Sequence, residues 1–439
     1  MSGGHHSVRG TGVSYNQPIM LPRPPQTWRA TLVIGLAVLP LASTSASFPT
    51  VRAAAADDGR WVASWVAAQQ LTEPHNLPPA PGLAGQTLRQ MIQPSLGGRR
   101  LRVTLSNAFG DGDLTVDSVR VARSAGLAAI DPSSDRALTF AGAPSVTIPR
   151  GAVMVSDAIP FDVAPLANLA VTMHLVSVPA ALTGHPGSRT TSFIQAGDVS
   201  AAPDLRGPAT IDHWYVLSGL DVWADPRAAA IVVLGDSITD GRGSTTNKND
   251  RWPNLLSQRL RANPAFADVA VLNAGMGGNR LLRDGIGPNA LARFERDVLA
   301  VPGARWLVVL EGVNDIGTAV DARKRGEGAA TAADVIGAYR QMIVRAHSHG
   351  LRVYLATIMP FEGFAAYSSP QSEADRQEVN RWIRAAGERD GVIDFDAVAR
   401  DPARPSRLRE GVDGGDHLHP SAAGYRILAD AIDLALFAR

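Results

Sequence analysis

The chain has 439 residues, of which 45% are hydrophobic and 19% charged, and its formal net charge is +1. This length and composition indicate a globular protein with room for two domains and exclude a disordered chain. Lys and Arg are spread along the sequence, so nothing predicts a nucleic-acid partner or an anionic membrane surface. The chain holds no cysteine, which excludes disulfides, thiolate nucleophiles and Cys-ligated metals.

Residues 1–56 are predicted to be a signal peptide followed by a disordered N-terminus. Arg23 and Arg29 precede an apolar run from residue 30 to residue 42, and small residues follow it. The run is short for a membrane span and is interrupted by Pro40, which is typical of an export signal. We therefore expect a secreted protein with no stable membrane span after signal removal; an uncleaved anchor is the alternative.

Residues 57–226 are predicted to form an all-β sandwich of the jelly-roll type. Apolar and polar residues alternate over 101–105, 114–121 and 169–176. Gly and Pro turn signals separate these segments, and no amphipathic helical pattern stands out among them. The stretch 198–212 is rich in Ala, Pro, Asp and Gly and is predicted to be a surface loop.

Residues 227–439 are predicted to form an α/β domain. Apolar segments of strand length alternate there with longer segments of helical periodicity, which is typical of βαβ units and a parallel sheet covered on both faces. The predicted strands span residues 229–234, 269–272, 306–310, 353–358 and 392–395. The predicted helices span residues 252–263, 332–347, 372–388 and 422–437.

A serine follows the first of these strands directly. The apolar run that starts at Ile231 leads into Gly235, Asp236 and Ser237. In open α/β sheets, ligands bind at this carboxyl end of the strands. A serine hydroxyl is a nucleophile only when a base removes its proton. Ser237 could instead be no more than the N-cap of the following helix.

A carboxylate and a histidine lie three residues apart in the loop before the last predicted helix. Asp416 and His419 can hydrogen-bond within one turn, which would fix the imidazole tautomer and stabilise the imidazolium. Together with the serine, they predict nucleophilic acyl transfer. The same loop could instead bind a metal, because Asp416, His417 and His419 are plausible ligands, with Asp236 and Asp240 as possible partners.

Acyl transfer also needs hydrogen-bond donors for the oxyanion that develops in the transition state. The glycine-rich turn 273–279 offers backbone N–H groups, because glycine lets a substrate approach the backbone closely. The segment Gly312-Val313-Asn314-Asp315 offers an asparagine amide. With the Ser237 N–H, these groups would form an oxyanion hole.

Four motifs in this order resemble the four sequence blocks of the SGNH hydrolases, also called GDSL esterases or lipases. They are Gly235-Asp236-Ser237, the turn from Asn273 to Gly278, Gly312-Val313-Asn314-Asp315, and Asp416-x-x-His419-Pro420. The resemblance covers residues 227–439 and implies a flavodoxin-like domain with a five-stranded parallel sheet. The G-x-S-x-G elbow of the α/β-hydrolases does not occur in the sequence.

The resemblance implies a role for each matched residue. Ser237 would be the nucleophile, His419 the general base and then acid, and Asp416 the residue that orients His419. Gly278, through its backbone N–H, and Asn314, through its side-chain amide, would complete the oxyanion hole. No cofactor and no metal is expected.

Three residues next to the matched motif residues are predicted to have supporting roles. Gly277 is the alternative to Gly278 as a donor in the turn. Asp315 and Asp236 are expected to hydrogen-bond the local backbone rather than to take part in the chemistry.

The N-terminal half more loosely resembles β-sandwich modules that precede the hydrolase domain in some exported members of this family. Trp61, Trp65, Trp214 and Trp223 could form a surface on which sugars stack, although aromatic residues in a sandwich more often belong to its core. The sequence assigns this half no definite role.

Together these observations predict a secreted serine esterase for short acyl groups, such as acetyl on an extracellular glycan. Substrate choice is expected to depend on the loops 316–331 and 361–375, neither of which has the amphipathic pattern of a lipase lid. The alternatives are a lipase or acyltransferase for longer acyl lipids, a metal-dependent phosphoesterase, and a catalytically silent carbohydrate-binding protein. The expected partner is the ester substrate, a glycan acyl ester or a lipid; the oligomeric state stays open.

Overall fold

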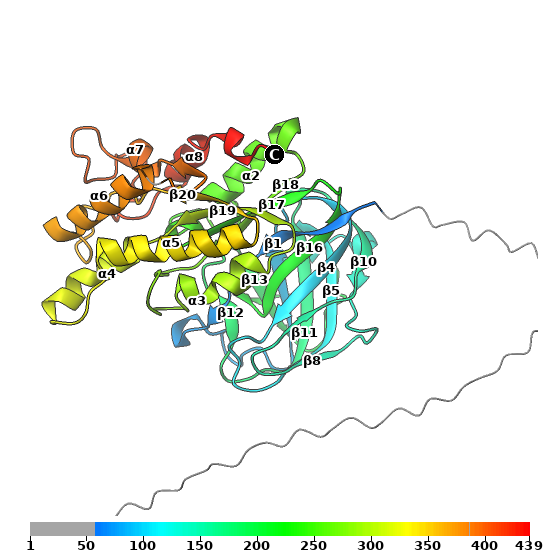
Figure 1. Ribbon diagram of the computed structural model, residues 1–439. Helices are drawn as coiled ribbons and strands as arrows, with labels where there is room; N and C mark the ends of the chain where they lie inside the picture. Colours follow the sequence, from blue (N-terminus) through cyan, green and yellow to red (C-terminus); the bar gives the residue numbers. More distant parts are fainter. Residues whose placement is uncertain (1–57, 386) are drawn as a thin grey trace, which may run out of the picture. The chain divides into compact units, whose positions relative to one another are not determined.

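The computed structural model describes residues 58–385 and 387–439 (Figure 1). The predicted signal region, residues 1–56, lies outside the described residues. Antiparallel strands occupy the chain from Arg60 to Ala224, and parallel strands alternating with helices follow from Ala229. Within the described residues, none of the helices has both the length and the apolar character needed to span a lipid bilayer.

The antiparallel strands form two larger sheets and one small one, which confirms the predicted all-β half. The first sheet has the order β1-β16-β4-β10 with β9 beside β4; the second has the order β14-β13-β3-β11-β5-β6 with β7 and β8 also paired to β5; the third is β15-β12-β2. The strands are β1 Arg60–Val66, β2 Gln70–Leu71, β3 Gln86–Ile92, β4 Gly98–Ser106, β5 Leu114–Gly126, β6 Ala129–Ile130, β7 Arg136–Ala137, β8 Val146–Ile148, β9 Val153–Val155, β10 Ile159–Val163, β11 Leu169–Ser177, β12 Thr183–His185, β13 Ser192–Ala196, β14 Ala209–Ile211, β15 Trp214–Tyr215 and β16 Leu217–Ala224.

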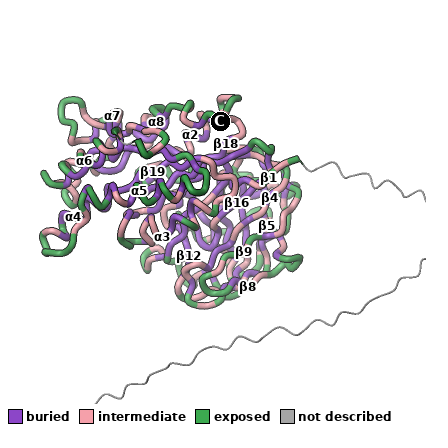
Figure 2. Tube along the Cα trace, in the orientation of Figure 1, coloured by how far each residue is buried: buried purple, intermediate pink, exposed green. Residues whose placement is uncertain are grey.

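Alternation along the strands builds the core of this half. In β4, Leu101, Val103 and Leu105 are fully buried and the residues between them are partly exposed, as a strand with one face on the core requires. Figure 2 shows buried residues following the strands and exposed ones gathering in the loops. The predicted loop 198–212 is wrong in part, because β14 pairs there with β13 at the sheet edge.

The four tryptophans of this half form two separate pairs rather than one surface. Trp65 and Trp214 are buried and meet edge to face, with ring centroids 4.9 Å apart. Trp61 and Trp223 meet in the same way at 5.4 Å, and the Arg102 guanidinium lies over Trp61. A single stacking surface made of all four rings is therefore wrong.

The second half contains a parallel sheet of five strands in the order β18-β17-β19-β20-β21, which confirms the predicted flavodoxin-like α/β fold. All seven residues of β17 are buried, because helices cover both faces of the sheet. In Figure 1, α5 crosses in front of the sheet, while α2 lies beside α8. The strands are β17 Ala229–Gly235, β18 Val269–Gly275, β19 Ala304–Leu310, β20 Arg352–Ala356 and β21 Gly391–Ile393.

The helices include all four predicted segments and several that the periodicity did not indicate. The helices are α1 Ser237–Asp240, α2 Trp252–Ala262, α3 Ala290–Phe294, α4 Val313–Lys324, α5 Ala332–Ser348, α6 Pro370–Ala385, α7 Phe395–Ala399 and α8 Ala422–Asp430. The last predicted helix is too long, because α8 ends at Asp430 and the Asp433 side chain caps a separate 3-10 turn.

The predicted substrate loop 316–331 is also wrong over most of its length. Residues up to Lys324 belong to α4, which buries Ile316, Ala319 and Val320. These residues follow the spacing of one helical face, so they pack inward rather than lining an open loop. Only residues 325–331 connect α4 to α5 as a loop.

The two halves are joined by hydrogen bonds between their backbones and side chains. The Ala63 N–H in β1 donates to the Pro302 carbonyl at 2.9 Å, and the Val271 N–H in β18 donates to Ser95 Oγ at 3.0 Å. These contacts place β1 alongside the edge strand of the parallel sheet.

A second set of contacts reaches the loop after α1. His185 Nε2 lies 2.9 Å from Asp240 Oδ1, and Arg251 Nη2 donates to the Ser188 carbonyl at 2.7 Å. The Asn247 N–H donates to the Arg189 carbonyl at 2.9 Å. The segment 185–191 of the sandwich therefore lies against the short helix that begins at Ser237.

This close approach predicts a steric effect at Gly187. A Cβ there would lie 1.6 Å from Asp240 Oδ2, so the buried Asp240 carboxylate, which His185 contacts, must shift to admit a methyl group. We expect Gly187→Ala to lower the free energy of unfolding by about 1–3 kcal/mol, as overpacking does. Thermal unfolding of the two proteins measures this change.

Gly112→Ala is the matched control, because a Cβ at Gly112 would meet only Pro179 at 3.8 Å, an ordinary contact. Equal melting temperatures for Gly187→Ala and the unmodified protein would contradict the interface described above.

Candidate active site

Ser237 lies at the carboxyl end of β17, between the neighbouring strands β18 and β19. The Asp236 side chain accepts a hydrogen bond from the Ile238 N–H at 2.9 Å and is the N-cap of α1. Ser237 is therefore the first residue of the helix, and its interpretation as an N-cap is wrong. The expectation that Asp236 bonds the local backbone is confirmed.

Ser237, His419 and Asp416 form a continuous chain of hydrogen bonds. Ser237 Oγ lies 2.8 Å from His419 Nε2, and His419 Nδ1 lies 2.7 Å from Asp416 Oδ2. An ionised carboxylate only accepts hydrogen bonds, so the ring proton sits on Nδ1 and Nε2 is free to accept the serine proton. This arrangement can convert a hydroxyl into a nucleophile.

The loop itself holds Asp416 in place. Asp416 Oδ1 accepts hydrogen bonds from the Leu418 N–H at 3.0 Å and from the His419 N–H at 2.8 Å, so one carboxylate oxygen closes the turn while the other meets the imidazole. His417 points to a different acid, with Nδ1 2.5 Å from Asp413 Oδ2. Across residues 58–385 and 387–439, no group of three or more His, Cys, Asp or Glu side chains is placed to hold a metal ion.

The pKa of His419 lies below its usual value. Burial is the main cause, and it is opposed by the hydrogen bond and charge of Asp416. Arg242 and Arg189 lower the pKa of His419 further, because nearby cations disfavour the imidazolium. His419 is thus a neutral base over a wider pH range than a free histidine.

Arg189 comes from the sandwich and was not predicted as part of the site. Its φ of +50° is a left-handed conformation that residues other than glycine rarely adopt. It lies more than two hundred residues before His419 in the sequence, and nothing in the sequence pattern links the two. The sandwich therefore contributes to the electrostatics at His419.

One candidate backbone donor lies at the carboxyl end of β17 and another in the turn after β18, where the Met276 N–H donates to the Gly235 carbonyl at 2.9 Å. Gly278 has a φ of +66°, a conformation that favours glycine. Among the hydrogen bonds of the described residues, neither the Ser237 N–H nor the Gly278 N–H has an acceptor. Unpaired N–H groups at a strand end can bind an oxyanion.

The side chain of Asn314 is held at both ends. Its Nδ2 donates to the Asn279 carbonyl at 2.8 Å, which joins α4 to the glycine-rich turn and leaves the second amide proton free. Its Oδ1 accepts a hydrogen bond from the Tyr367 hydroxyl at 2.8 Å. Tyr367 thus fixes which way the amide points, a positioning role that the sequence did not indicate.

Gly317 explains how Tyr367 reaches this position. A Cβ at Gly317 would lie 2.2 Å from the Tyr367 ring, so only glycine lets the ring lie directly against α4. The ring also packs edge to face against Phe364, with centroids 4.9 Å apart.

Asp315 supports the turn from the other side. Its Oδ2 accepts from the Leu281 N–H at 2.8 Å and its Oδ1 from the Leu282 N–H at 3.3 Å, which confirms that it bonds the loop backbone. Burial raises the pKa of Asp315 to about 6.

Arg293, which the sequence did not single out, lies beneath the site and is completely buried. Nη2 donates to the Gly235 carbonyl at 3.0 Å, Nη1 to the Ala274 carbonyl at 2.8 Å, and Nε to Asn279 Oδ1 at 2.9 Å. Nη2 also lies 3.5 Å from Glu311 Oε1. One guanidinium therefore connects the ends of β17 and β18 with the glycine-rich turn.

Residues 233–427 match the model of the family described as GDSL-like Lipase/Acylhydrolase. The matched segment begins in β17 and ends in α8, so it includes Ser237, Gly278, Asn314, Asp416 and His419. No curated protein sequence gives a significant match to this chain.

Several solved structures are similar to about half of the chain. An acetylxylan esterase (Axe2) from Geobacillus stearothermophilus is 22% identical, covers 48% of this chain and 94% of its own, and has a TM-score of 0.37. A GDSL-like lipase from Bacteroides thetaiotaomicron is 19% identical, with coverages of 47% and 87% and a TM-score of 0.36. The acetyl xylan esterase AlAXEase is 24% identical, with coverages of 46% and 96% and a TM-score of 0.36.

The environment of His419 predicts a pH profile. Since the base must be neutral, kcat/KM for an activated ester should fall on the acidic side with an apparent pKa below the usual value of about 6.5 for histidine. Arg189→Gln removes a cation that disfavours the imidazolium, so we expect the acidic limb to move to higher pH. Measuring kcat/KM between about pH 4 and 8 for both proteins locates the acidic limb of each pH profile.

Arg136→Gln, a substitution of an exposed arginine on β7, is the control and should leave the limb in place. A limb that does not move in Arg189→Gln would contradict the electrostatic role of Arg189.

Proposed function

We propose that this chain, whose residues 233–427 are a domain of the GDSL-like lipase/acylhydrolase family, is an exported serine esterase with Ser237 as its nucleophile. Its family indicates a carboxylic ester hydrolase. We propose here its catalytic residues and its substrate class. The observation that carries it is the hydrogen-bonded chain from Ser237 Oγ through His419 to Asp416. Serine activation by a base that a carboxylate orients is the usual route to acyl transfer.

In the first half of the reaction, His419 Nε2 takes the proton of Ser237 as Oγ attacks the ester carbonyl carbon. Asp416 stabilises the imidazolium that forms. The carbonyl oxygen becomes an oxyanion, for which the Ser237 N–H, the Gly278 N–H and the free proton of Asn314 Nδ2 are the donors. The intermediate collapses when the C–O bond breaks and His419 gives its proton to the departing alcohol.

In the second half, water replaces the alcohol. His419 removes a proton from water as the oxygen attacks the acyl-enzyme, and the same three donors hold the second oxyanion. Collapse releases the carboxylic acid and returns the proton to Ser237 Oγ. His419 therefore carries the proton in both halves of the reaction.

The surroundings of the site favour a short acyl group on a polar alcohol. The apolar residues of α4 are buried in the domain, so this helix offers no free apolar face to act as a lid. Phe361 is buried and packs against Tyr367, which in turn bonds Asn314. Arg242, which lies near His419, is exposed. An acetyl group on an extracellular glycan matches this polar setting better than a long acyl chain.

Export is proposed from the N-terminal sequence. The charged, apolar and small-residue segments of residues 1–56 follow the order of a secretory signal. Ester-bearing glycans outside the cell are then the substrates within reach.

The nucleophile is tested by hydrolysis of p-nitrophenyl acetate, butyrate and palmitate. We expect turnover to be highest for acetate and to persist in EDTA. In Ser237→Ala, kcat should fall by at least about 10⁴, because the three residues act as one unit. Turnover that survives Ser237→Ala, or that EDTA abolishes, would contradict the proposal. If turnover were highest for the palmitate ester, the proposed substrate would be a long-chain acyl lipid rather than a short acyl ester.

The oxyanion hole is tested by a double-mutant cycle. Asn314→Ala should cost about 2.7–4 kcal/mol of transition-state stabilisation with little change in KM. Tyr367→Phe keeps the ring but loses the hydrogen bond to Asn314 Oδ1, so we expect a smaller loss in kcat that vanishes when Asn314 is already alanine. Purely additive losses in the double variant would show that Tyr367 does not act through Asn314.

A further inference from the structure

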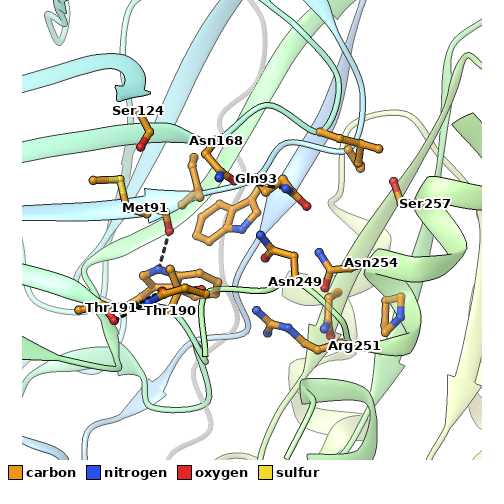
Figure 3. A pocket seen from close by; sticks show the side chains of 18 of the residues that line it. Met91, Gln93, Ser124, Asn168, Thr190, Thr191, Asn249, Arg251, Asn254 and Ser257 are labelled. Carbon is orange, nitrogen blue, oxygen red and sulfur yellow. Dashed lines mark hydrogen bonds between the residues drawn. The ribbon is translucent and has the colours of Figure 1, made fainter. Parts of the chain in front are cut away.

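A cavity of about 210 Å³ lies between the sandwich and the α/β domain and does not include Ser237 or His419 (Figure 3). On the sandwich side, its lining includes Gln93 and Asn168; on the other side it includes Asn249, Asn254 and Ser257. Figure 3 shows the amide groups of Gln93, Asn249 and Asn254 gathered around the same space. The mechanism proposed above uses none of these residues.

The polar lining is almost entirely neutral. Its amide and hydroxyl side chains belong to Gln93, Ser95, Ser124, Asn168, Thr190, Thr191, Asn247, Asn249, Asn254, Ser257 and Asn273. The lining contains no carboxylate, and its guanidinium, Arg251, already donates to the Asp240 and Ser188 carbonyls. Amides and hydroxyls both donate and accept hydrogen bonds, so this set complements a neutral ligand rich in hydroxyl groups.

Three polar atoms of the lining are buried without a hydrogen-bond partner among the described residues. They are Gln93 Oε1, Ser257 Oγ and Arg251 Nε. A polar atom that is buried without a hydrogen-bond partner destabilises the folded state, so most buried polar atoms in folded proteins are paired. Three of the fourteen such atoms among the described residues belong to the lining of this one cavity, where a bound molecule would supply partners.

The backbone around the cavity is unusually strained. Eight non-glycine residues of the described chain have a left-handed φ, and four of them line this cavity: Leu127, Leu166, Asn247 and Asn249. Asparagine tolerates this conformation, whereas leucine rarely adopts it. Residues held in such conformations cluster at binding sites, where the surrounding structure imposes a shape.

The cavity also offers apolar surface of the kind that sugar rings contact. Trp65 and Trp214 belong to the lining, and Leu127 stands at the tip of the β5–β6 hairpin with 79% of its surface exposed. A sugar ring has hydroxyls at its edge and C–H groups on its faces, so it needs both polar and apolar partners. The volume is several times the roughly 30 Å³ share of one water molecule, which suits a single ring.

We propose that this cavity is a second binding site, which holds a neutral sugar residue of the polysaccharide that carries the ester. This proposal rests on the proposed function for the identity of the polymer, but the binding itself does not depend on catalysis. The site would bind the glycan between the two domains while Ser237 attacks an acyl group on another sugar residue of the same glycan.

Titration calorimetry of the mature protein with xylotetraose, cellotetraose and trigalacturonic acid tests the proposal. We expect at least one of the two neutral oligosaccharides to bind and the anionic one to bind more weakly. Leu127→Asp at the exposed rim and Asn254→Leu in the wall should each weaken the neutral complex by about tenfold, the loss expected for a central contact. Leu77→Asp, which changes an exposed leucine outside the cavity, should have no effect.

Three results would overturn the proposal. They are the failure of both neutral oligosaccharides to bind, equal or tighter binding of trigalacturonic acid, and binding that Leu127→Asp and Asn254→Leu leave unchanged. Hydrolysis of p-nitrophenyl acetate, measured in parallel, reports on Ser237 alone and should be the same in Leu127→Asp as in the unmodified protein. If the unmodified protein binds neither neutral oligosaccharide but still hydrolyses p-nitrophenyl acetate, the second site is refuted and the esterase stands.

Discussion

The geometry of the site depends on one buried cation, the guanidinium of Arg293. It lies under the carboxyl ends of β17 and β18 and donates to the Ala274 and Gly235 carbonyls. It also holds Asn279, whose own carbonyl accepts from Asn314. Burying a guanidinium carries a large desolvation cost, which is offset only when all its N–H groups are bonded. Because those bonds end on three separate segments, the strand that presents Ser237 and both donor segments keep a fixed relation to one another.

The acids around Arg293 are more numerous than one cation can neutralise. Burial, together with the nearby charges of Asp315 and Asp240, raises the pKa of Asp236 to about 7. Burial also raises the pKa of Glu311 well above its usual range. Near neutral pH, part of this group is therefore protonated. That state suits an esterase, because full negative charge beneath the oxyanion hole would oppose the charge that develops in the transition state.

The sequence predicted those parts of the molecule whose signal is local. Alternating apolar and polar residues located the antiparallel strands, and apolar runs separated by helical segments located the parallel sheet. The Asp416–His419 pair lies within one turn, so its spacing alone suggested the contact. The roles of Arg293 and Tyr367 could not be predicted, because the fold brings their partners to them from distant parts of the sequence. Arg293 lies in a short helix that shows no hydrophobic periodicity. Tyr367 contacts Asn314 only because Gly317 has no side chain in its way. α4 was mistaken for a loop because its first residues coincide with a recognised motif, and α8 ends early because Asp433 caps a new turn.

The sandwich is tied to the hydrolase half at the helix of the nucleophile, through His185 and Asp240, and it brings Arg189 towards His419. The proposed reaction depends on one atom, Ser237 Oγ. Incubation with diethyl p-nitrophenyl phosphate, followed by peptide mapping, tests that atom directly, since an activated serine is phosphorylated and holds the label. We expect one label per chain, on the peptide that contains Ser237, and a loss of esterase activity in proportion to the fraction of chains labelled. Complete inhibition with the label on another residue, or unchanged activity after labelling of Ser237, would contradict the proposed reaction.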